Sequence, residues 1–222
     1  MARVIGLRRL RGCLCAASSV LALGVVSTSV PAGQAWAGDF DVSTPQTVVY
    51  GNSGPGDPAT LLTSVSSSGN TVRLATGANI TQSAYGGYAD ATTADDVANS
   101  NGLTVSGGTV GQNAYGGYSD QGDASSNTVT ISGASTITGE VNGGRAASAT
   151  TGKAENNTVT IEGSAHTSNN IYGGRSTSSL AGGNAVSIGE NAVIRSDVYG
   201  GQSQNGTAAQ NSVTIGGSAD VR

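Results

Sequence analysis

The fold of this chain is decided by the stretch Asn127-Thr128-Val129-Thr130-Ile131-Ser132-Gly133. Polar and aliphatic residues alternate in it, so Val129 and Ile131 face one side of an extended strand and the threonines face the other. A glycine ends the phrase. This alternation predicts a strand with one buried face.

The same phrase occurs six times. An Asn comes two residues before each aliphatic pair, and a glycine pair follows five of the six Asn residues after 15 or 16 positions. The segment from glycine pair to next Asn varies from 11 to 15 residues, as expected for a loop that tolerates insertions. The six Asn residues are Asn70, Asn101, Asn127, Asn157, Asn184 and Asn211.

This periodicity predicts an all-β fold, a parallel β-helix (β-solenoid) of about six coils with 26 to 31 residues each. A second aliphatic pattern, such as Ile137 with Val141, indicates a further strand segment in each coil, and the glycine pair could lie in a third. In the fourth repeat Thr167 takes the first position of this pattern. We expect the strands to stack in parallel and in register.

Two recurring residue types receive structural interpretations. The Asn side chain tolerates left-handed turn conformations and can hydrogen-bond to its copy in the next coil, so the six Asn residues are expected to form a structural ladder. The glycine pairs are expected to make a bend that a Cβ atom would obstruct.

Residues 1–37 are typical of a signal peptide. Four arginines precede an apolar run from Cys13 to Val26, and Ala35-Trp36-Ala37 predicts cleavage between Ala37 and Gly38. The run is too short to span a bilayer, for which about 20 residues are needed. We therefore expect export through the inner membrane and no membrane-spanning segment in this chain.

Cleavage would change the charge of the chain. The mature chain would keep six basic and fourteen acidic residues, a net charge of −8, and no cysteine. This excess of acidic residues argues against a nucleic-acid partner, whose phosphates require Lys and Arg.

The mature chain divides into two predicted regions. Residues 38–69 resemble a degenerate first coil or N-terminal cap, because Val49-Tyr50-Gly51 repeats the phrase found at the later glycine pairs. Residues 70–222 contain the solenoid repeats, of which the last is incomplete.

A signal peptide followed by phrases such as Asn127 to Gly133 and Asn113-Ala114-Tyr115-Gly116-Gly117-Tyr118 resembles the passenger region of Gram-negative autotransporters, the adhesin-like proteins of type V secretion. The resemblance covers residues 70–222. It implies a right-handed parallel β-helix carried to the cell surface, or released outside the cell, by export machinery that includes a C-terminal β-barrel, which we expect beyond Arg222. The last two repeats are also similar to head repeats of trimeric autotransporter adhesins, an alternative architecture.

The sequence contains no catalytic or metal-binding motif. The only histidine of the chain, His166, stands where other repeats have a small residue, and Asp95, Asp96, Asp120 and Asp123 lie in variable connectors. We therefore expect neither enzymatic activity nor a cofactor, with a polysaccharide-acting β-helix enzyme as the alternative.

Large planar side chains flank the glycine pairs. We call the residues before each pair the inner column and those after it the outer column. The outer column suits recognition of a glycan or protein on a host or cell surface, whereas the inner column is expected to stack for stability. The inner column is Tyr85, Tyr115, Asn142, Tyr172 and Tyr199, and the outer column is Tyr88, Tyr118, Arg145, Arg175 and Gln202.

Overall fold

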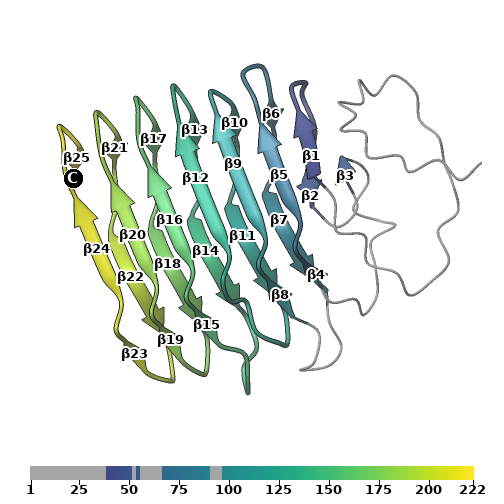
Figure 1. Cartoon of the computed structure of the whole chain (residues 1–222), viewed down its shortest axis with the longest axis vertical. Helices are drawn as coiled ribbons and strands as arrows, with labels where there is room; N and C mark the ends of the chain where they lie inside the picture. Colours follow the sequence, from purple (N-terminus) through teal and green to yellow (C-terminus); the bar gives the residue numbers. More distant parts are fainter. Residues whose placement is uncertain (1–38, 52–53, 56–66, 91–96) are drawn as a thin grey trace, which may run out of the picture. The chain divides into compact units, whose positions relative to one another are not determined.

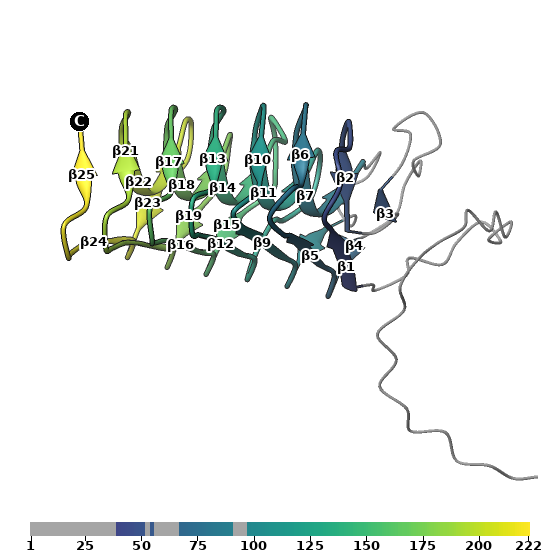
Figure 2. The same ribbon diagram turned by 90° about the horizontal axis from the view of Figure 1, so that it is seen from above.

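The computed structural model describes residues 39–51, 54–55, 67–90 and 97–222. All regular structure in this part of the chain is strand. The strands wind into a parallel β-solenoid of about six coils, with equivalent strands of successive coils side by side in both views (Figures 1 and 2). The predicted all-β solenoid is therefore confirmed. The described residues include no helix able to cross a membrane.

The Asn-led phrases form one face, here called the aliphatic sheet. Its register is strict: Val129 pairs with Leu103 in one neighbouring strand and with Val159 in the other. In spatial order the strands are β1 (Asp39–Val42), β5 (Thr71–Leu74), β9 (Gly102–Ser106), β12 (Thr128–Ser132), β16 (Thr158–Ile161), β20 (Ala185–Ile188) and β24 (Ser212–Ile215).

A second face, the glycine sheet, contains the glycine pairs. The strands that contain a glycine pair have six residues each, and Gly117 pairs with Gly87 and Gly144 in the neighbouring strands. They are β2 (Val49–Tyr50), β7 (Ala84–Ala89), β11 (Ala114–Ser119), β14 (Val141–Ala146), β18 (Ile171–Ser176) and β22 (Val198–Ser203), with β3 (Gly54–Pro55) antiparallel at the β2 edge.

Two-residue strands complete each coil. The third face, the short-strand sheet, contains β6 (Asn79–Ile80), β10 (Thr109–Val110), β13 (Thr136–Ile137), β17 (His166–Thr167), β21 (Val193–Ile194) and β25 (Asp220–Val221). Corner strands before the Asn residues are β4 (Ser67–Ser68) with β8 (Ala98–Asn99), and β15 (Ala154–Glu155) with β19 (Ala181–Gly182) and β23 (Ala208–Ala209).

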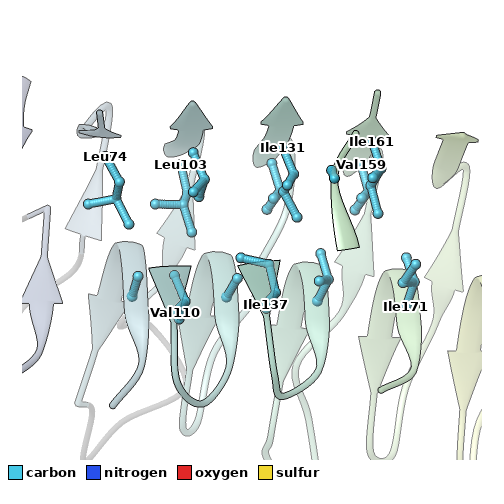
Figure 3. Packing of buried hydrophobic residues seen from close by; sticks show 14 of the residues in the cluster. Leu74, Leu103, Val110, Ile131, Ile137, Val159, Ile161 and Ile171 are labelled. Carbon is cyan, nitrogen blue, oxygen red and sulfur yellow. The ribbon is translucent and has the colours of Figure 1, made fainter. Parts of the chain in front are cut away.

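The core is a set of aliphatic rows inside the solenoid (Figure 3). Val105, Ile131 and Ile161 from the aliphatic sheet lie in one row, and Leu103 lies in the neighbouring row with Val129. Ile137 and other residues of the short-strand and glycine sheets lie opposite. The second aliphatic pattern of the sequence therefore spans two strands: Ile137 belongs to β13 and Val141 to β14. In the fourth repeat, Thr167 is buried, and its hydroxyl has no hydrogen-bond partner among the described residues.

The first described residues already follow the register of the coils. Phe40 pairs with Val72 in the aliphatic sheet, and Tyr50 pairs with Tyr85 in the glycine sheet. Strand β3 then covers the outer edge of β2. Ala37 and Gly38, where cleavage is predicted, lie outside the described residues.

The six Asn side chains form one column. Each Asn in the first five coils donates from Nδ2 to Oδ1 of the next Asn at 2.9 to 3.2 Å, and the Oδ1 atom also accepts the backbone N–H of the preceding Asn. From Asn101 onward, Nδ2 also donates to a corner carbonyl at 2.8 to 3.0 Å. The carboxamides therefore join consecutive coils at a corner.

Two expectations about this corner were wrong. The left-handed conformation belongs to the residue before each Asn, for example Ser126 with a φ of 58°, and not to the Asn itself. The glycine pairs lie inside the strands of the glycine sheet, so the third strand segment is confirmed and the bend at the glycine pair is not. They are still intolerant of a Cβ atom: one built on Gly117 would lie 2.5 Å from the Asn127 carboxamide, and one on Gly116 would lie 2.4 Å from the Gly143 carbonyl oxygen.

The core should be most sensitive to truncation in a central coil. Ile131→Ala removes a fully buried side chain, so we expect a loss of about 2–5 kcal/mol in the free energy of unfolding. Thr130→Ala, on the outward face of the same strand, is the matched control and should change it by less than about 0.5 kcal/mol. Urea unfolding followed by far-UV circular dichroism measures both, and equal effects would contradict the assignment of faces.

Candidate functional site on the glycine sheet

The outward surface of the glycine sheet carries both columns of planar side chains. Ala84 and Ala89 at the two ends of β7 are buried, whereas Tyr85 and Tyr88 are both partly exposed. The alternation of inward and outward residues therefore changes phase at the glycine pair, and both tyrosines face outward. Their ring centroids lie 5.0 Å apart.

All seven tyrosines of the chain lie on this sheet. Tyr50 extends the inner column by one coil. The outer column contains Tyr88 and Tyr118, followed by the two arginines and Gln202. Inner and outer columns thus form one face, which we call the tyrosine–arginine face.

The tyrosine rings stack on one another along the solenoid. Tyr50 and Tyr85 have centroids 4.8 Å apart and planes 6° apart, Tyr85 and Tyr115 are 4.9 Å apart, and Tyr88 and Tyr118 are 5.2 Å apart. These spacings are close to the strand separation of about 4.8 Å. Neighbouring rings therefore cover most ring faces, so a ligand would meet ring edges and hydroxyl groups.

Asn142 interrupts the inner column. It pairs in register with Tyr115 and Tyr172, and it is fully buried. Its side-chain Nδ2 and Oδ1 atoms have no hydrogen-bond partner among the described residues. Such a buried unsatisfied amide costs about 1–3 kcal/mol, so it requires an explanation.

Two arginines lie beside this interruption. Arg145 and Arg175 are partners on the neighbouring strands β14 and β18. The Arg175 guanidinium carbon lies 4.8 Å from the Tyr172 ring centroid, and that of Arg145 lies 5.9 Å from the Tyr118 ring centroid. The Arg145 guanidinium therefore extends the stack of outer-column tyrosines, and the Arg175 guanidinium lies on the inner-column ring of its own strand.

Glu140 joins the two arginines. Nη1 of Arg175 donates to both carboxylate oxygens at 3.1 Å, and Nη1 of Arg145 donates to Oε2 at 3.2 Å. The three side chains are 19 to 28% exposed. Like charges on directly paired residues repel, and one carboxylate offsets only one of the two cations. The cluster therefore keeps a net positive charge.

The first coils carry the opposite charge. Tyr88 donates its hydroxyl to Asp120 Oδ2 at 3.5 Å, and Asp90 is close enough to interact with the same carboxyl. Burial, with a contribution from Asp90, raises the pKa of Asp120. The tyrosine–arginine face is thus acidic at Asp90 and Asp120 and basic at Arg145 and Arg175.

The other residues considered from the sequence do not join this site. His166 is exposed on the short-strand sheet between Thr136 and Val193. Asp95 and Asp96 lie outside the described residues. No group of three or more His, Cys, Asp or Glu side chains in the described ranges could hold a metal ion.

Glu140 was missed as a site residue. It occupies the position before the strand, where other repeats have Asn113, Asn170 or Asp197. The available signal was the occurrence of arginine at the same place in two successive repeats, because paired cations require a counter-charge nearby.

No protein-family model, curated protein sequence or solved structure matches this chain.

The tyrosine stack predicts a pH dependence. Burial is the main cause that raises the pKa of Tyr85, Tyr88 and Tyr118 above the ordinary value near 10. Since the folded-state pKa exceeds the unfolded one, these tyrosines contribute stability that is fully present below about pH 10 and is lost as the pH rises toward the folded values.

Near-ultraviolet absorbance of tyrosinate measures this effect. The native chain should titrate at higher pH than the same chain in urea, with the main step coinciding with loss of β-structure. Superimposed native and denatured titration curves would contradict the stacked, buried arrangement.

Proposed function

We propose that this chain is a non-catalytic, exported solenoid of the autotransporter passenger type that binds a glycan or protein on a host or cell surface through its tyrosine–arginine face. The observation that carries the binding proposal is the concentration of all seven tyrosines and two arginines on one sheet. Tyrosine and arginine, together with tryptophan, are the side chains enriched where binding energy is concentrated.

The geometry favours an extended ligand. Successive coils repeat the same backbone positions at the strand spacing, so hydroxyl groups and guanidinium groups recur along the solenoid. Several weak contacts along one ligand chain add up to a useful affinity through effective concentration. A chain with these properties acts by display and binding.

The export part of the proposal rests on the sequence. The cationic and apolar leader, its Ala37/Gly38 junction and the resemblance of the repeats to autotransporter passengers support a location at the outer membrane, at the cell surface or outside the cell. The solenoid fold is compatible with this proposal.

Binding of the exported chain to printed glycans and to immobilised surface proteins tests the proposal. Tyr118→Ala combined with Arg145→Ala should weaken binding by at least about tenfold, because both side chains belong to the outer column. Thr130→Ala with Thr160→Ala on the aliphatic sheet is the matched control and should bind like the unchanged chain.

Two results would contradict the proposal. One is unchanged binding of the Tyr118 and Arg145 variant together with lowered thermal stability, which would make the columns structural. The other is steady release of sugars from an acidic polysaccharide by the exported chain, which would indicate an enzyme.

A further inference from the structure

We propose that Arg145, Arg175 and Asn142 form a carboxylate-binding site that takes a uronic acid residue of a glycan. This inference rests on the proposed binding function and specifies its ligand. It depends on three properties of the third and fourth coils: their charge, their free hydrogen-bonding groups and the interruption of the tyrosine column.

The charge is unusual for this chain. Residues 38–222 carry a net charge of −8, so most of the surface repels an anion. Among the described basic residues, only Arg145 and Arg175 are direct partners on neighbouring strands. With Glu140 as their shared partner, they leave one positive charge without an offset. A single carboxylate is complementary to this excess charge.

The hydrogen-bonding groups fit a carboxylate next to hydroxyl groups. Each guanidinium has several N–H donors in a planar fork, and within the described residues only Nη1 of each arginine is used, by Glu140. The remaining donors can bind both oxygens of a ligand carboxylate.

The side chain of Asn142 favours a sugar acid over an acidic peptide as the ligand. Its buried Nδ2 and Oδ1 atoms offer a donor and an acceptor that no described residue uses. A hydroxyl group beside the ligand carboxylate both donates and accepts, so it can pair with this amide. Each uronic acid residue of a glycan chain carries free hydroxyl groups on the same ring as its carboxylate, whereas the side chains of Asp and Glu in an acidic peptide carry none.

Asn142 is fully buried, so a ligand can reach it only after a local movement. The Arg175 guanidinium lies over the Tyr172 ring, beside the place where an inner-column ring is missing. A ligand carboxylate would draw this guanidinium from the ring, and the sugar would occupy the interruption between Tyr115 and Tyr172.

Calorimetric titration of the full chain with a short oligomer of galacturonic acid tests the site. We expect binding that weakens by about tenfold or more when the oligomer is fully methyl-esterified or when Arg175 is changed to Gln. Arg195→Gln is the matched control, because Arg195 is an exposed basic residue outside the glycine sheet. Its affinity should equal that of the unchanged chain.

The Asn142→Tyr variant distinguishes binding at this site from attraction by the positive charge alone. This variant keeps both arginines and Glu140, but a tyrosine would complete the inner column and fill the interruption. We expect it to lose oligogalacturonate binding while its thermal unfolding temperature stays the same or rises. Unchanged binding by Asn142→Tyr would overturn the inference, as would equal binding of the oligomer and its methyl ester.

Other outcomes distinguish this inference from the proposed function. Equal affinity for an oligoglutamate peptide would overturn the choice of a sugar. Binding of neutral glycans that depends on Tyr118, without any binding of oligogalacturonate, would overturn the carboxylate site and leave the proposed function standing.

Discussion

The solenoid depends on the contact between the Asn ladder and the glycine pairs. Each central Asn carboxamide uses its full capacity: in Asn127, Nδ2 donates to Asn157 and to the Ala98 carbonyl, and Oδ1 accepts from the backbone and side chain of Asn101. The same carboxamide fills the space next to Gly117 where a Cβ atom would lie. A polar group buried this deeply is tolerated because it is fully hydrogen-bonded.

This contact explains the character of the binding face. The second glycine of each pair lies against an Asn carboxamide, and the first glycine of the first four pairs lies against the glycine carbonyl of the next coil. The sheet therefore has no side chains at its centre. The residues on both sides of the pair then face outward and meet their equivalents at the strand spacing. The face is regular in the tyrosine-rich coils, and it departs from this regularity at Asn142, Arg145 and Arg175. We expect these three residues to determine which ligand binds, because the stacked rings elsewhere mainly contact one another.

Much of the fold could be predicted from the sequence because the constant spacing within the repeat determines the register of the strands. Alternation at Val129 and Ile131 identifies the buried face, and the constant spacing from Asn to glycine pair requires parallel, in-register coils. The bend predicted at the glycine pairs was wrong because glycine is locally associated with turns. The actual reason for glycine is a contact with the Asn side chain of the next coil, which the local sequence does not reveal. The left-handed residues were misassigned for a similar reason: Ser126 and Gln210 give little local signal of that conformation. The two columns of planar side chains were predicted, but not that both lie on one face. They share a face because the alternation of inward and outward residues shifts at the glycine pair, which a simple alternating pattern does not predict. The bridge made by Glu140 depends on side-chain directions across coils.

A double-mutant cycle on Gly117 and Asn127 tests the central claim most directly. Gly117→Ala alone should lower the free energy of unfolding by about 2 kcal/mol or more, because the new Cβ atom meets the Asn127 carboxamide. In a chain that already carries Asn127→Ala, the same change should cost much less, with a coupling free energy of at least about 1 kcal/mol. Urea unfolding of the four chains measures this coupling. Strictly additive effects would contradict the dependence of the glycine pairs on the Asn ladder.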